Sequence, residues 1–167
     1  MNISFYVLSE SKAQDSLGFM CQLTQTALNK GTQALLILVT DEALLGALDE
    51  ALWANDTTSF IPHERLMAQH LADGHLKENH VADGQLPKGT EIAIAPVLLG
   101  AYLPANFNGI IINTTSHPIT YFISATNNAA PTRILELIYP DDASKQSGRE
   151  KYKQYQQLGY ELTHFKV

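Results

Sequence analysis

The feature that most constrains the fold is the run Ala34-Leu-Leu-Ile-Leu-Val39, which is apolar at every position and as long as a typical strand. A strand with one face in solvent alternates apolar and polar residues, whereas this run contains no polar position. It therefore predicts a strand buried on both faces. Such strands are typical of parallel sheets that are covered by helices on each side.

Other segments of strand length lie along the chain. Residues 2–8 predict a short buried strand, and residues 162–167 predict a last strand at an edge of the sheet. Three more buried strands are expected, at residues 91–97, 109–113 and 133–139. Because helical segments alternate with these strands, the sequence predicts an α/β fold. We expect one three-layer domain over residues 1–167, with a mostly parallel, Rossmann-like sheet.

The first helix is expected at residues 11–29, between the first two strands. The second is expected after Thr40 and up to about Trp53. Both segments repeat apolar side chains at helical spacing. Gly31 supplies a stop for the first helix, and Thr40 is the expected N-cap of the second.

A third helix of about fifteen residues is expected near the C-terminus, with Asp142 as its cap and Gly159 as its end. Residues 55–89 show weak periodicity. They predict loops, with one helical turn around residues 64–72.

Composition narrows the class of protein. The chain has 167 residues, a formal net charge of -6 and a single cysteine, Cys21, which lies among apolar residues and predicts a buried, unreactive thiol. No run of eighteen apolar residues and no basic N-terminal segment occurs, so neither a membrane span nor a signal peptide is expected, and a cytoplasmic location fits. The acidic charge argues against a protein that coats DNA over its whole surface.

Sequence motifs of common enzymes on α/β folds are missing. The chain has no G-x-x-x-x-G-K-[ST] loop and no G-x-S-x-G elbow, and the turn after the first strand, residues 9–12, lacks glycine. The adjacent acids Asp49 and Glu50 predict a solvated helix face, and Asp141 and Asp142 predict a helix cap. The sequence therefore indicates no catalytic residue and no cofactor.

Four histidines, His63, His70, His75 and His80, lie within eighteen residues and raise the question of a metal site. Their spacings of seven, five and five residues do not match the pair at i and i+4 of a helical metal site, and no cysteine lies near. We expect a solvated loop and no metal; elemental analysis of the purified protein would reveal a bound metal.

The C-terminal segment reverses the charge of the chain. Residues 1–132 contain five Lys or Arg and twelve Asp or Glu, whereas four cations follow within nine positions from Lys145. On a helix, five residues share one face, namely Lys145, Arg149, Tyr152, Lys153 and Gln156. Lys151 falls off this face and is expected in solvent. Cations around an aromatic ring suit an acidic peptide that ends in a hydrophobic residue, and single-stranded DNA would also use cations and stacking.

A second candidate surface follows the second helix. Trp53 ends that helix, and the loop beyond it carries Phe60, Ile61 and Pro62. Large apolar side chains at such a place can anchor a protein interface. Alternatively, Trp53 and Phe60 cover the core beneath a loop.

Two motifs give the chain a family resemblance. Leu48-Asp-Glu-Ala-Leu-Trp53 with Ser59-Phe-Ile-Pro-His63, and Arg149-Glu-Lys-Tyr-Lys-Gln-Tyr155 with Gly159-Tyr160, closely resemble the chi subunit family of bacterial DNA polymerase III. The resemblance covers the chain in order, with residues 64–90 and 98–131 matching least.

The resemblance implies a function in DNA replication. Chi proteins are non-catalytic α/β subunits of the clamp-loader assembly that pair with the psi subunit, in some members with a helicase, and bind the acidic C-terminal tail of single-stranded DNA-binding protein (SSB). By resemblance, Trp53, Phe60, Ile61 and Pro62 meet psi. The tail is held by Lys145, Arg149, Tyr152 and Lys153, with Gln156 standing where the family commonly has a basic residue.

A protein of this kind would contact DNA only indirectly. The sequence leaves two alternatives to such a replication subunit, namely a nucleotide- or metal-dependent enzyme on a Rossmann-like frame and a direct single-stranded DNA binder.

Overall fold

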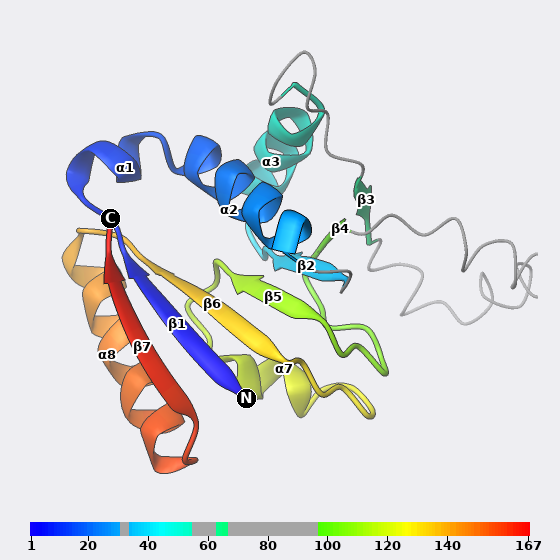
Figure 1. Ribbon diagram of the computed structural model, residues 1–167, viewed down its shortest axis with the longest axis vertical. Coiled ribbons are helices and arrows are strands. Elements are labelled where there is room, and N and C mark those ends of the chain that lie inside the picture. The colour runs from blue at the N-terminus through cyan, green and yellow to red at the C-terminus, as the bar shows by residue number, and fades with distance from the viewer. Residues whose placement is uncertain (31–33, 55–62, 67–96) are drawn as a thin grey trace, which may run out of the picture.

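A computed structural model describes residues 1–30, 34–54, 63–66 and 97–167. Within these residues, seven parallel strands form one sheet in the order β3-β4-β2-β5-β6-β1-β7 (Figure 1). The strands are β1 (Asn2–Val7), β2 (Leu35–Leu38), β3 (His63–Arg65), β4 (Val97–Gly100), β5 (Ile110–Asn113), β6 (Arg133–Ile138) and β7 (Glu161–Lys166). The predicted parallel α/β fold is confirmed.

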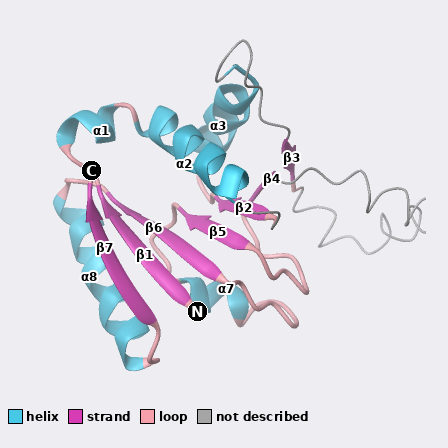
Figure 2. Ribbon diagram, in the orientation of Figure 1, coloured by secondary structure: helices cyan, strands magenta, loops and turns pink. Residues whose placement is uncertain are grey.

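Helices cover both faces of the sheet (Figure 2). The described helices are α1 (Glu10–Gln14), α2 (Ser16–Lys30), α3 (Glu42–Ala54), α7 (Ile119–Ile123) and α8 (Asp142–Gln157). Side chains of α2 and α3 join one core cluster, and those of α7 and α8 join the other. The three layers are therefore α2 and α3, the sheet, and α7 with α8.

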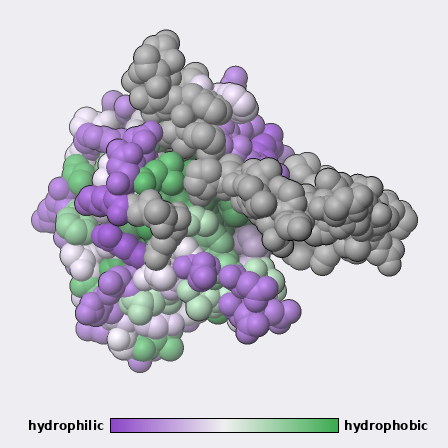
Figure 3. Space-filling view, turned by 45° about the vertical axis from the view of Figure 1, so that its right-hand side comes forward, coloured by the Kyte–Doolittle hydropathy of each residue, from purple (hydrophilic) through white to green (hydrophobic). Residues whose placement is uncertain are grey.

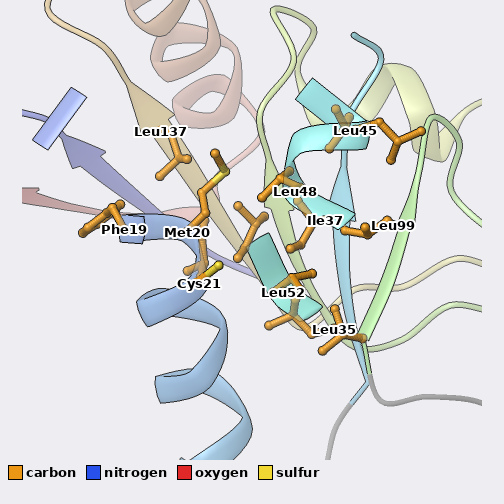
Figure 4. Packing of buried hydrophobic residues seen from close by; sticks show 14 of the residues in the cluster. Phe19, Met20, Cys21, Leu35, Ile37, Leu45, Leu48, Leu52, Leu99 and Leu137 are labelled. Carbon is orange, nitrogen blue, oxygen red and sulfur yellow. The ribbon is translucent and has the colours of Figure 1, made fainter. Parts of the chain in front are cut away.

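Strand β2 explains why the apolar run predicted the fold. Leu35 and Ile37 lie in the cluster beneath α2 and α3, whereas Leu36 and Leu38 lie in the cluster on the opposite face. All four side chains are fully buried. Successive strand residues point to opposite faces, so a strand in the middle of a three-layer fold needs apolar residues at every position. Figure 4 shows Leu35, Ile37 and Leu99 packed against Leu48 and Leu52 of α3.

Several predicted boundaries needed correction. Asp41, and not Thr40, caps α3, because its carboxylate accepts hydrogen bonds from the N–H groups of Ala43 and Leu44. Likewise the cap of α8 is Asp141, and not Asp142, because the carboxylate of Asp141 accepts the Ser144 N–H at 2.9 Å. Both errors place the cap one residue away, since either neighbour has a suitable side chain.

Other predictions were wrong in kind. The segment 11–29 is not one helix, because α1 ends at Gln14 and α2 begins at Ser16. A helical turn was expected around residues 64–72, but residues 64 and 65 belong to the short strand β3, and residues 67–72 lie outside the described residues. The helix α7 was not predicted. Strand β4 covers Val97–Gly100, so it overlaps the strand expected at 91–97 only at Val97; residues 91–96 of that prediction, and Gly31, lie outside the described residues.

Two further expectations concern the ends of α8 and the cysteine. Gly159 follows α8 with φ of 81°, a left-handed conformation that glycine adopts without steric cost, so it ends the helix as predicted. Cys21 is buried, and burial, followed by the charge of Asp15, raises the pKa of its thiol. The reactive thiolate is therefore disfavoured, as expected for a packing residue.

On the face that Figure 3 shows, hydrophilic residues lie around an apolar patch. Among the described residues, no helix is long and apolar enough to cross a membrane.

Candidate protein-interaction site

Helix α8 is held close to the sheet by a small residue. Gly148 is buried, and a Cβ atom built at this position would lie 2.4 Å from Cδ1 of Ile138 on β6. Any side chain here would force Ile138 or the helix to move, because real carbon atoms do not approach so closely. The glycine therefore lets α8 lie directly against the side chain of Ile138.

A buried polar network holds the same face of the helix farther along α8, at Lys151 and Tyr155. Glu136 of β6 is completely buried, and its carboxylate accepts hydrogen bonds from Lys151 Nζ at 2.8 Å, Tyr155 Oη at 2.6 Å and Asn113 Nδ2 at 3.0 Å. Lys151 also donates to the carbonyl oxygen of Thr115 at 2.5 Å. Because every oxygen of the carboxylate has a donor, the charge is accommodated where an unpaired one would be costly.

The network corrects the prediction for Lys151. Its side chain is 4% exposed and pairs with Glu136, whereas the sequence indicated a solvated lysine. Burial, and then the charge of Glu136, raise the pKa of Tyr155, so the hydroxyl stays protonated and donates to the carboxylate. The hydroxyl oxygen in turn accepts the Ile119 N–H at 2.7 Å, which ties α8 to the start of α7.

Outside this anchored side, α8 and the sheet enclose a groove of about 520 Å³, which we call the α8 groove. Residues of three strands and one helix line it, namely Phe5, Val7, Ile138, His164, Lys145, Gly148, Arg149, Tyr152 and Lys153. The sheet supplies apolar side chains from β1 and β6, and α8 supplies three cations. None of the lining residues carries a carboxylate.

Aromatic rings make up much of the groove wall. The ring of Tyr152 lies 5.6 Å from that of Phe5 and 5.0 Å from that of His164. His164 stacks on Phe5 with centroids 5.5 Å apart and an interplanar angle of 21°. Rings at these separations attract one another beyond their buried area, so the wall is preorganised to receive an apolar side chain.

Four of the five residues predicted for the C-terminal surface meet in the α8 groove. Lys145, Arg149, Tyr152 and Lys153 line it, whereas Gln156 is exposed and is not among the lining residues. The sequence missed His164, which β7 brings opposite α8. Alternation along β7 places Leu162 and His164 on the face that packs toward α8. This two-residue period is the sequence signal that could have identified His164 as a residue facing α8.

The second predicted surface is described only in part. Trp53 is 60% exposed, so it does not cap the core, and its ring meets that of His63 edge-on at 5.6 Å. Residues 60–62, with the predicted contacts Phe60, Ile61 and Pro62, lie outside the described residues. The exposed indole keeps the interface hypothesis open for Trp53.

Beside Trp53, two predicted solvated groups are paired. The Nε2 atom of His63 lies 2.6 Å from Oδ1 of Asp49, and Arg65 Nη1 lies 3.6 Å from Oδ2. The side chain of His63 is 1% exposed, which corrects the prediction of a solvated loop histidine. The other three histidines lie outside the described residues, and within the described part of the chain no three metal-ligating side chains gather.

The carboxyl end of β1 is where open α/β sheets commonly bind phosphates. A pocket there is lined by Glu10, Ala13, Gln14, Pro140 and Asp141. The carboxylates of Glu10 and Asp141 would repel a phosphate, and the turn after β1, residues 9–12, has no glycine that would let backbone N–H groups approach a phosphate closely. This geometry is unfavourable for a nucleotide.

Comparison with known proteins gives a consistent family signal. A family model described as "DNA polymerase III chi subunit, HolC" matches residues 1–163. DNA polymerase III subunit chi of Pseudomonas aeruginosa is 29% identical over 161 residues, which cover 96% of this chain and 92% of that protein. The subunit chi of Escherichia coli K12 is 28% identical over 167 residues, covering 96% and 95% respectively.

Similar solved structures support the fold alone. A chain in a complex of S. cerevisiae Dbp5 with Nup159, Gle1, IP6 and ADP superposes with a TM-score of 0.58 and 13% identity over 98% of this chain and 41% of that chain. S. cerevisiae Dbp5 bound to RNA and ADP BeF3 gives a TM-score of 0.54, 15% identity and coverage of 99% and 41%. This chain therefore spans less than half the length of each.

Proposed function

Because the chain belongs to the DNA polymerase III chi subunit family, we propose that it is a non-catalytic replication subunit that joins the polymerase assembly to SSB. In this proposal residues 1–167 act as one domain with two protein-binding surfaces. The α8 groove binds the acidic C-terminal tail of SSB, and the surface around Trp53 binds the psi subunit.

The observation that carries the proposal is the combination of charge and shape in the α8 groove. Lys145, Arg149 and Lys153 surround an apolar floor formed by Phe5 and Ile138. Carboxylates of the tail would pair with the cations, while a terminal hydrophobic side chain would occupy the floor. The groove has a volume of about 520 Å³ and is bounded by one helix and three strands, whereas single-stranded DNA commonly follows a longer basic channel.

The experiment that tests the proposal is a pull-down of the full chain with full-length SSB and with SSB that lacks its last residues. Retention of only the full-length protein supports a tail site. Equal retention of both proteins, or of neither, contradicts it. A filter assay with single-stranded DNA in the absence of SSB tests the direct DNA binder, for which this proposal expects no retention.

The enzyme alternative predicts a ligand. A nucleotide or divalent metal that binds the native state would raise its thermal stability by mass action. We expect no shift of the melting temperature with a nucleotide, because the carboxylates of Glu10 and Asp141 occupy the end of the sheet where phosphates commonly bind. We expect none with a divalent metal, because no three potential metal ligands gather among the described residues.

Substitution of Trp53 tests the second surface. We expect Trp53→Ala to abolish co-purification with psi, because an exposed tryptophan is the type of residue that dominates interface energies. Tail-peptide affinity and the melting temperature should stay at the wild-type values, since the indole lies outside the α8 groove and is 60% exposed. Loss of both partners together would show that Trp53 supports the fold instead.

A further inference from the structure

His164 is the titratable side chain that the sheet contributes to the α8 groove. The sheet residues that line the groove are Phe5, Val7, Ile138 and His164, and of these His164 alone can change charge. It belongs to β7, the edge strand that pairs with β1 from Asn2↔Glu161 to Val7↔Lys166. The pairing brings it beside Phe5 although 159 positions separate the two residues in the chain.

The imidazole is held by stacking and leaves its nitrogen atoms available. It lies nearly parallel to the Phe5 ring and 5.0 Å from the Tyr152 ring. The residue is exposed, and within the described part of the chain its ring forms no hydrogen bond. A neutral imidazole offers one N–H donor, whereas the protonated ring offers two donors and a positive charge.

The charged and titratable groups around His164 can be named for each neighbouring element. Helix α8 presents Lys145, Arg149, Lys153 and the Tyr152 hydroxyl. On β7 itself, alternation places Lys166 on the same face.

The lining residues from β1 and β6 are apolar. Glu161 lies at an odd position of β7 and therefore on the opposite face of the strand. The groups that face His164 are thus cations and a phenol.

We propose that His164 is a ligand-contacting residue of the α8 groove, which binds a carboxylate of the acidic peptide in its protonated form and so couples peptide binding to proton uptake. This inference rests on the proposed tail-binding function and deepens it. It assigns to this groove a wall residue that regulates affinity by pH.

The sign of the coupling follows from the surrounding charges. A bound peptide brings carboxylates beside the imidazole, and these favour its protonated form. Binding is therefore accompanied by proton uptake, and peptide affinity rises as the pH falls through the range in which an imidazole titrates, between pH 5 and 8. Carboxylates of the peptide stay ionised over this range, because they titrate near pH 4.

The test measures anisotropy of a labelled SSB-tail peptide with the full chain at pH 6 and pH 8 and constant ionic strength. Wild-type protein is expected to bind about three- to fivefold more tightly at pH 6, the size of an exposed ion pair. His164→Phe keeps an aromatic ring without a titratable proton. It should lose the pH dependence, so that its own dissociation constants at pH 6 and pH 8 agree to within about twofold.

Two variants guard the interpretation. His117→Phe replaces an exposed histidine that stacks on Tyr121 away from the groove, and it should retain the full pH dependence. His164→Gln should also lose the dependence, and circular dichroism of both His164 variants should match wild type because the residue is exposed.

The outcomes separate the two proposals. An undiminished pH dependence in His164→Phe and His164→Gln overturns the role of His164 while leaving tail binding intact. Absence of peptide binding by the wild-type protein at either pH overturns the proposed function itself.

Discussion

Replacement of Lys151 by methionine is expected to lower the free energy of unfolding by about 3–5 kcal/mol, the cost of removing one partner from a buried ion pair. The lysine is 4% exposed and its partner Glu136 is fully buried, so the variant would leave a carboxylate with two neutral donors and no counter-charge. For a chain of this length, such a loss corresponds to a fall in melting temperature of roughly 6–20 °C. Thermal and urea unfolding monitored by circular dichroism would measure it.

Two further variants make this prediction specific. Lys153→Met, two residues along the same helix, should change stability by less than about 0.5 kcal/mol, because that side chain is exposed. The double variant Lys151→Met with Glu136→Gln should recover part of the loss, since it removes the buried charge along with its partner. If Lys151→Met and Lys153→Met proved equally stable, the network would not anchor α8.

Replacement of Arg149 by alanine is expected to weaken binding of the SSB-tail peptide by about 1.5–3 kcal/mol, the range for a hydrogen bond to a charged group. This corresponds to roughly a tenfold to hundredfold rise in Kd. Arg149 lines the α8 groove, and among the described residues it has no ion-pair partner, so its guanidinium is available to a carboxylate. Fluorescence titration with the labelled peptide would measure the change.

Controls distinguish a local contact from a general effect of charge. Lys30→Ala on α2 removes the same charge far along the chain, outside the α8 groove, and should leave Kd within about twofold of wild type at moderate salt. The melting temperature of Arg149→Ala should not fall, because the side chain is exposed. Wild-type affinity should decrease as salt increases. Unchanged peptide affinity in Arg149→Ala would remove the residue from the site.

Local sequence patterns correctly predicted those helices and strands whose residue types reflect which side chains are buried. The apolar run at 34–39 indicated a doubly covered strand, and β2 has all four of its side chains buried. The N-caps of α3 and α8 were harder to predict. Thr40 and Asp41 are both suitable caps for α3, and Asp141 and Asp142 are both suitable caps for α8. The choice between neighbours depends on backbone angles that the amino-acid types do not fix.

In the candidate site, too, local periodicity predicted one part, whereas contacts between distant residues decided the other. Helical periodicity grouped Lys145, Arg149, Tyr152 and Lys153 on one face, and all four line the α8 groove. The periodicity could not reveal that the neighbouring Lys151 is buried. That outcome depends on Glu136, which is fifteen residues earlier in the chain and reaches α8 only through the position of β6 in the sheet.

By itself, the sequence determined the alternation of strands and helices and the charged face of the last helix, because both follow from residue types at fixed local spacing. The tertiary structure alone decided what that face confronts. Parallel pairing of β1 with β6 and β7 brings Phe5, Ile138 and His164 together beneath α8. No local spacing encodes that meeting, since it depends on the order and register of strands distant in the sequence.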